Sequence, residues 1–221
     1  MFQEYVADAA LVALMHNGEV CDMKTFQCPK VHKSFEERLT DLIAKIGENM
    51  NLRRAAMLEV SNGVIASYVH NACKPNLGKI GVLVALESNG DKAKLQELGK
   101  HIAMHVAASN PQFLTIADVD QASIDHEKAI FSEQAKASGK PENIIEKMVE
   151  GRIKKYFDEV VLEEQAYIMD PDKKVKQIVA DAAKEMGADI KLKAFVCFRL
   201  GEGLEKRNED FAAEVASQLK K

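Results

Sequence analysis

The stretch from Gly78 to Pro111 constrains the fold of this chain more than any other. It opens with an unbroken apolar run over residues 80–86, which is typical of a strand covered on both faces. Residues 88–91, Ser-Asn-Gly-Asp, have the short polar side chains and the glycine of a tight turn. Apolar residues then recur at three- and four-residue spacing until Pro111, which lacks the amide that another helical turn needs. The stretch therefore predicts a buried strand, a turn and a helix folded back onto the sheet.

Further strands are predicted on both sides of this unit. Residues 54–60 and 64–70 are rich in apolar residues and are separated by the turn sequence Ser-Asn-Gly. Residues 190–200 alternate in polarity, which predicts a strand with one covered face. That face is expected to consist of Leu192, Ala194, Val196, Phe198 and Leu200. No pattern requires parallel strands joined by crossover helices, so the fold class is α+β, with antiparallel sheets covered by helices.

The N-terminal part predicts two helices. In the first, from Phe2, the buried side is expected to hold Phe2, Val6, Ala9, Ala10 and Ala13. No capping residue precedes it, which favours missing upstream residues, although a frayed natural terminus gives the same pattern. In the second, Ser34 and Glu37 have the spacing of a capping box. Gly47 interrupts the apolar stripe of this helix, either for a close backbone contact or at the helix end.

Residues 118–138 and 142–157 predict two amphipathic helices joined by Ser-Gly-Lys-Pro, a helix stop followed by a helix start. So short a connection makes the two helices antiparallel. The pair has few large apolar residues, so we expect it to project from the body and to offer its apolar seam to a second copy of the chain. The segment from residue 163 onward returns to the body, which makes the helical hairpin an insertion.

Composition excludes several classes of function. The net charge of −4 argues against a nucleic-acid-binding protein. No apolar run approaches the length of a membrane span, and no secretory signal is visible, so we expect a cytoplasmic protein without membrane contact. The four cysteines lack zinc or redox spacing, which suits free thiols in a reducing compartment.

No catalytic set is present in the sequence, and no cofactor is expected, because phosphate-binding and dinucleotide-binding loops are missing. His101 and His105 have the spacing of a helical metal site, but Ile102 replaces the glutamate of the H-E-x-x-H motif and no third ligand is evident. A packed or partner-contacting histidine is the better interpretation of His105. A metal enzyme that uses His101 and His105 is the least favoured function considered for this chain. The residues alone therefore predict a binding protein.

Seven segments, in this order, closely resemble bacterial elongation factor Ts, the guanine-nucleotide exchange factor of elongation factor Tu. They are K-I-G-E-N-M-N-L-R-R (45–54), S-Y-V-H (67–70), K-I-G-V-L-V-A (79–85), K-H-I-A-M-H-V-A-A-S-N-P (100–111), S-G-K-P (138–141), K-M-V-E-G-R (147–152) and D-F-A-A-E-V-A (210–216). Each segment alone is weak evidence, but all seven in register are specific, and together they span essentially the whole chain.

The resemblance implies a core of two related subdomains, an inserted coiled-coil hairpin and a C-terminal helix module. The expected divisions are 1–63, 64–117 with 163–203, 118–162 and 204–221. The family also has an N-terminal helical domain and two strands that end in Thr-Asp-Phe-Val, and neither is found in these residues. This sequence therefore resembles a form of the family without its wedge into the G domain of elongation factor Tu, for which we expect weak exchange activity.

The resemblance also implies a partner-binding surface. Ile46 and Gly47 match an Ile-Gly pair that faces the G domain of Tu, and His70 matches a histidine that contacts its third domain. Ile168 and Met169 match an apolar pair on that same surface, and the helix around Phe211 is expected to dock on the G domain. Alternative roles remain open: core packing for Ile46 and Ile168, a turn for Gly47, and a solvated strand end for His70.

The implied mechanism is allosteric exchange, in which no covalent bond is made or broken. A factor that binds nucleotide-free Tu more tightly than the GDP form must weaken GDP binding by linkage. A scaffold that binds Tu or itself without exchange activity is the alternative. Co-purification with Tu would distinguish a Tu-binding protein from a purely self-associating one.

Overall fold

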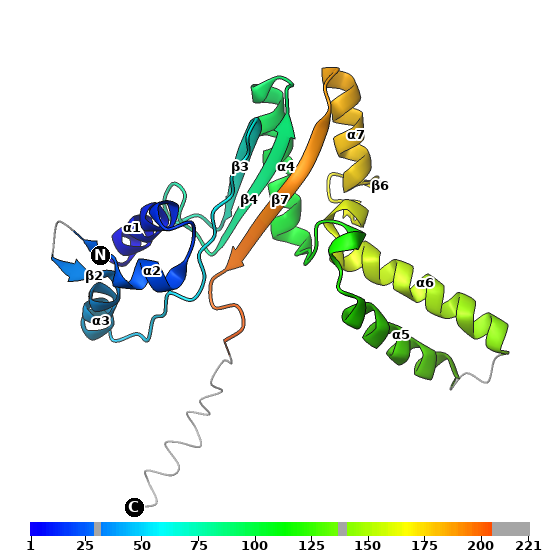
Figure 1. Cartoon of the computed structure of the whole chain (residues 1–221), viewed down its shortest axis with the longest axis horizontal. Helices are drawn as coiled ribbons and strands as arrows, with labels where there is room; N and C mark the ends of the chain where they lie inside the picture. Colours follow the sequence, from blue (N-terminus) through cyan, green and yellow to red (C-terminus); the bar gives the residue numbers. More distant parts are fainter. Residues whose placement is uncertain (29–31, 137–140, 205–221) are drawn as a thin grey trace, which may run out of the picture.

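The centre of the molecule is an antiparallel sheet of three strands in the order β3–β4–β7 (Figure 1). A computed structural model describes residues 1–28, 32–136 and 141–204. In it, β3 is Gly63–His70, β4 is Ile80–Ser88 and β7 is Ile190–Arg199. The fold is thus α+β with small antiparallel sheets, as the sequence predicts.

The predicted strand–turn–helix unit is confirmed as β4 followed by α4 (Lys92–Ser109). The Asp91 carboxylate caps α4 by accepting hydrogen bonds from the Ala93 and Lys94 amides, each at 2.9 Å. The helix ends at Asn110, which adopts the left-handed conformation (φ 49°) just before Pro111. Both ends of α4 are therefore fixed by local chemistry.

Two helices, α4 and α7 (Val175–Met186), pack on one face of this sheet and share its main hydrophobic core (Figure 1). A Cβ added at Gly99 of α4 would lie 2.6 Å from the Cβ of Ala66 on β3 and 3.3 Å from a methyl of Leu86 on β4. The absent side chain thus allows α4 to approach the sheet closely. The fully buried members of the core include Val84, Leu86, Leu95, Ile102, Val106 and Val175.

The predicted covered face of β7 is wrong beyond Leu192. Ala85 pairs with Ala194 but Leu86 pairs with Leu192, so Lys193 is an extra residue on β7. This bulge exchanges the two faces of the strand. Phe195 and Cys197 consequently join the main core, whereas Ala194, Val196 and Phe198 lie on the opposite face.

The N-terminal helices α1 (Phe2–Met15), α2 (Val20–Thr25) and α3 (Phe35–Ile46) form a second hydrophobic cluster beside the sheet (Figure 1). A two-stranded ladder, β1 (Gln27–Cys28) with β2 (Lys33–Ser34), precedes α3. The capping box is confirmed, since Ser34 Oγ accepts from the Glu37 amide and Glu37 accepts from the Ser34 amide. Gly47 ends α3 in the left-handed conformation (φ 79°). This confirms the prediction that Gly47 marks the helix end.

The predicted buried side of α1 is only partly right. Ala9 and Ala13 are buried, but so are Tyr5 and Val12, whereas Phe2, Val6 and Ala10 are exposed. The Tyr5 ring lies 4.7 Å from the Phe35 ring, and its hydroxyl donates to the Phe35 carbonyl at 3.2 Å. Tyrosine buries an apolar ring while its hydroxyl needs a partner, so a count of apolar residues overlooks it.

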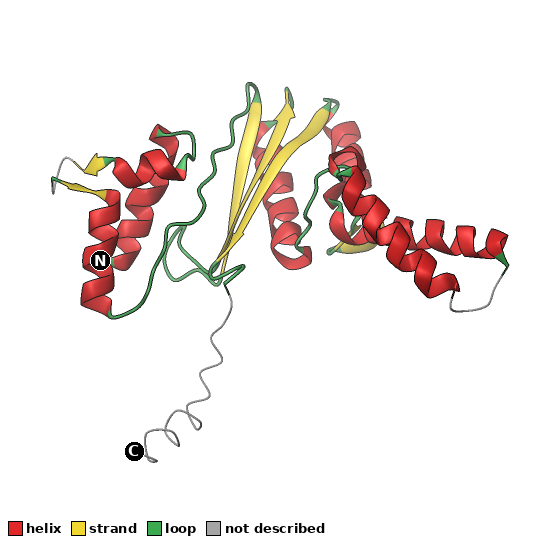
Figure 2. Cartoon of the chain, turned by 60° about the horizontal axis from the view of Figure 1, so that its bottom comes forward, coloured by secondary structure: helices red, strands yellow, loops and turns green. Residues whose placement is uncertain are grey.

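The predicted strand over residues 54–60 is wrong, because the described residues between α3 and β3 form an irregular connection (Figure 2). Composition favours a strand there, but a strand also needs a neighbouring strand for its amides and carbonyls. Instead, side chains hold the connection. Arg54 stacks 4.8 Å from the Phe198 ring centroid and forms an ion pair with Glu202.

Helices α5 (Gln121–Lys136) and α6 (Glu142–Val160) pack against each other and project from the body (Figure 2). A short 3₁₀ helix, η1 (Ile116–Asp118), leads into them. At their base Phe113 forms a parallel bridge with Val161, and Val119, Val160 and Val161 form a third buried cluster. Ile144 on α6 remains 42% exposed.

After α6, η2 (Leu162–Glu164) leads to a small hairpin of β5 (Ala166–Tyr167) and β6 (Asp170–Lys174), which continues directly into α7. The chain thus returns to the main core after the projecting helices. Within the described part of the chain, none of the helices is both long and apolar enough to cross a membrane.

Candidate partner-binding surface

The β5–β6 hairpin presents two adjacent apolar side chains at its tip. Ile168 is 40% exposed and Met169 is 50% exposed, whereas the preceding Tyr167 is buried beneath them. The Tyr167 hydroxyl lies 3.3 Å from Met169 Sδ. Residues 166–170 are called the display loop below. Exposure of both side chains argues against core packing for Ile168.

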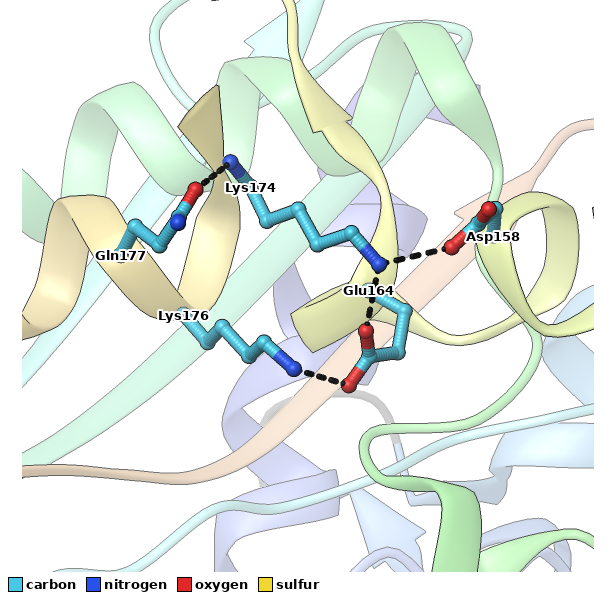
Figure 3. Close-up of polar contacts among 5 residues, drawn as sticks. All are labelled: Asp158, Glu164, Lys174, Lys176 and Gln177. Atoms are coloured by element: carbon cyan, nitrogen blue, oxygen red, sulfur yellow. Dashed lines mark hydrogen bonds and ion pairs between the residues drawn. The ribbon is translucent and has the colours of Figure 1, made fainter. Parts of the chain in front are cut away.

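A network of ion pairs holds the base of the display loop (Figure 3). Lys174 Nζ lies 2.8 Å from Asp158 Oδ1 and 2.7 Å from Glu164 Oε2. Lys176 Nζ lies 2.6 Å from Glu164 Oε1. Hydrogen bonds from Lys174, the larger effect, and from Lys176 lower the pKa of Glu164 below its ordinary value. The network therefore joins α6, η2 and the start of α7 around the loop.

A buried histidine of α4 holds the loop from the core side. His105 is fully buried, and its Nδ1 lies 3.3 Å from the Ile168 amide nitrogen, which donates to it. Its Nε2 lies 2.9 Å from Gln165 Oε1. Burial lowers the pKa of His105, while the bond to Gln165 opposes that shift. The imidazole is thus neutral, and both of its nitrogens are engaged.

These contacts decide between the two interpretations of the His101–His105 pair. A metal ligand needs a free nitrogen lone pair, and His105 already accepts through Nδ1 and bonds Gln165 through Nε2. Over residues 1–28, 32–136 and 141–204, no group of three or more His, Cys, Asp or Glu side chains is placed to hold a metal ion. His105 is therefore a packed, hydrogen-bonded histidine.

The other predicted contact residues lie at separate places. Ile46, 42% exposed, is the last residue of α3, and Gly47 beside it has open space where a Cβ would be. His70 is exposed at the end of β3, with Nδ1 3.1 Å from the Tyr68 hydroxyl, as a solvated strand end would be. The N-terminal helices lie on one side of the sheet and β6 on the other (Figure 1). Phe211 lies outside the described residues.

An apolar groove of about 440 Å³ lies where α1, the connection after α3 and the ends of β4 and β7 meet. Its apolar lining includes Phe2, Val6, Met50, Leu52, Phe198 and Leu204. Sequence patterns do not predict this groove, because they assign Phe2 and Val6 to the buried side of α1. The sequence feature that points to the groove is that α1 is apolar on more than one side.

The model of the family "Elongation factor TS" matches residues 1–202. The chain belongs to the elongation factor Ts family. Elongation factor Ts of Rhodospirillum centenum is 53% identical over 216 residues, which are 98% of this chain and 70% of that protein. Elongation factor Ts of Paramagnetospirillum magneticum is 55% identical, with the same coverage. Elongation factor Ts of Rhodospirillum rubrum is 53% identical over all of this chain and 72% of its own length.

Membership of the elongation factor Ts family confirms the resemblance read from seven short segments. It identifies the chain as a translation elongation factor, and protein biosynthesis as its process. The match to residues 1–202 includes the α3 end, the end of β3 and the display loop.

Proposed function

We propose that this chain binds elongation factor Tu and promotes the release of GDP from it. The observation that carries the proposal is the family match over residues 1–202. The exposed pair Ile168 and Met169 supports it, because two apolar side chains held together at a loop tip suit the centre of a protein interface. The chain acts in the cytoplasm, where translation takes place.

The proposed contact surface is extended. The display loop and His70 face the third domain of Tu, and Ile46 with Gly47 faces the G domain. Because these contacts lie on different sides of the sheet, Tu must bind with more than one of its domains.

Exchange follows from linkage between two binding equilibria. A chain that binds nucleotide-free Tu more tightly than the GDP form must lower the affinity of Tu for GDP by the same factor. Typical coupling free energies of about 1 to 3 kcal/mol correspond to about 5- to 150-fold. The chain itself makes and breaks no covalent bond and is not an enzyme in that sense.

The three hydrophobic clusters support the proposed division of the chain. The main core joins residues 64–114 with 162–197, the second cluster lies within residues 5–55, and the third lies at the base of α5 and α6. We accordingly assign an N-terminal core subdomain, a C-terminal one and an inserted coiled-coil hairpin. The predicted module over residues 204–221 falls, apart from Leu204, outside the described residues.

The Thr-Asp-Phe-Val motif of the family is not in residues 1–221. A nucleotide-exchange assay tests how much this motif contributes to GDP release. Release of fluorescent GDP from Tu is measured as the concentration of a polypeptide of residues 1–221 increases. We expect saturable binding with acceleration at least about tenfold below that of a relative with the motif, because a contact to the nucleotide site is missing. Full acceleration would contradict this expectation, and absence of binding would contradict the proposed function.

Self-association through the projecting helices is a second proposed property. It is supported by Ile144, a large apolar residue of α6 that remains 42% exposed on the hairpin. Light scattering should give a mass above that of one chain, and Ile144→Asp should return the mass to that of one chain, because a buried carboxylate disfavours the contact. A monomeric mass for the unmodified chain at high concentration would reject the proposal.

A further inference from the structure

Within the described residues, one hydrogen bond reaches the backbone of the display loop from outside the hairpin. The β5–β6 ladder contains only the pairs Ala166–Lys174 and Tyr167–Asp170, with an irregularity between them. The Ile168 amide donates to Nδ1 of His105, which lies 63 positions earlier in the chain. The tip that presents Ile168 and Met169 is thus tied to the C-terminal part of α4.

The environment of Gln165 determines which nitrogen of His105 holds the proton. Gln165 Nε2 donates to the Glu159 carbonyl at 2.6 Å and faces the Ser109 carbonyl at 3.5 Å. An amide nitrogen donates and does not accept, so the two carbonyls fix the orientation of the side chain. Its Oε1 must then face His105, which has to donate through Nε2–H. The lone pair of Nδ1 is left for the Ile168 amide.

Burial of a polar ring in the core also needs an explanation. His105 lies among Ile102, Ala103 and Val106 of α4, all buried, where an apolar residue would avoid any desolvation cost. The Tyr167 ring packs against it with 5.8 Å between centroids. Both hydrogen bonds of the imidazole end in the segment 165–168. The ring therefore couples α4 to the display loop.

We propose that His105 is a positioning residue for partner binding, which holds Ile168 and Met169 in their binding arrangement through the Ile168 amide. This inference rests on the proposed function of the display loop. A loop that is already ordered loses less conformational entropy on binding than a mobile one. The contact therefore stabilises the complex without touching the partner.

Two substitutions separate the two hydrogen bonds of the ring. In His105→Asn, the side-chain oxygen can occupy the place of Nδ1 and accept from the Ile168 amide, while the bond to Gln165 is lost. In His105→Gln, the longer side chain reaches the place of Nε2 and can donate to Gln165, while the acceptor for Ile168 is lost. Each variant thus removes one hydrogen bond, and His105→Asn, with one methylene fewer, removes more packing than His105→Gln.

The experiment measures hydrogen exchange of the Ile168 amide by NMR and the affinity of the full chain for purified elongation factor Tu. For His105→Gln we expect exchange faster by about tenfold and affinity weaker by about tenfold, the effect of one lost hydrogen bond. For His105→Asn, both quantities should stay within about threefold of the unmodified chain.

A purely structural role predicts that affinity falls in proportion to lost stability, so that His105→Asn loses at least as much as His105→Gln, and that result overturns the proposal. Unchanged Ile168 exchange in His105→Gln overturns it as well. If the unmodified chain does not bind Tu, the proposed function fails. The hydrogen-exchange rate of the Ile168 amide still decides whether His105 orders the loop. The two failures are therefore distinguishable.

Discussion

Met169→Asp is expected to weaken binding of elongation factor Tu by about 30- to 300-fold, or about 2 to 3.4 kcal/mol. Met169 is half exposed at the tip of the display loop, so the substitution adds no charge to the core of the free chain. In the complex, however, the new carboxylate would be buried without a partner. Titration calorimetry with nucleotide-free Tu measures the change directly.

Met169→Leu is the matched control, because it keeps an apolar side chain of similar volume at the same position. Its affinity should stay within about threefold of the unmodified chain. The unfolding midpoints of both variants should match that of the unmodified chain. Equal affinities for Met169→Asp and the unmodified chain would remove Met169 from the interface.

Gly99→Ala is expected to lower the free energy of unfolding by about 1 to 3 kcal/mol. An added Cβ would lie 2.6 Å from the Cβ of Ala66 and 3.3 Å from a methyl of Leu86, and both neighbours are buried strand residues. Helix propensity alone would favour alanine by about 1 kcal/mol. Steric overlap with two strands outweighs this gain, so α4 must move away from the sheet.

Gly151→Ala provides a control of opposite sign. Gly151 lies within α6, and nothing lies within 4 Å of the position of its missing Cβ. Only helix propensity applies there, so this variant should be more stable by about 0.5 to 1 kcal/mol. Denaturant unfolding measures both. If Gly99→Ala is equally stabilising, the close approach of α4 to β3 is wrong.

Local patterns predicted the elements whose ends are determined by neighbouring residues. Asp91 caps α4 and Ser34 caps α3 through bonds spanning two or three residues, and such bonds can be read from the sequence. The predictions that were wrong concern features that depend on residues far away in the sequence. Residues 54–60 have strand composition but no strand pairs with them in the described structure. The bulge at Lys193 depends on pairing with β4, and it reversed the predicted face of β7.

In the candidate site too, local features were predictable from the sequence and long-range contacts were not. An apolar pair followed by Pro171 is visible in the sequence, and the exposure of Ile168 and Met169 agrees with it. The support of the loop was not predictable, because His105 and Gln165 are 60 positions apart and neither belongs to a recognisable pattern. His105 was expected to be packed or to contact a partner, and only the structure connects it to Ile168.

The most direct test of the whole account is titration of the chain with elongation factor Tu in its nucleotide-free and GDP-bound forms. We expect binding to both, tighter for the nucleotide-free form by at least about fivefold, since the affinity difference is the coupling that promotes GDP release. Equal affinity for the two forms, or no binding to either, would contradict the account.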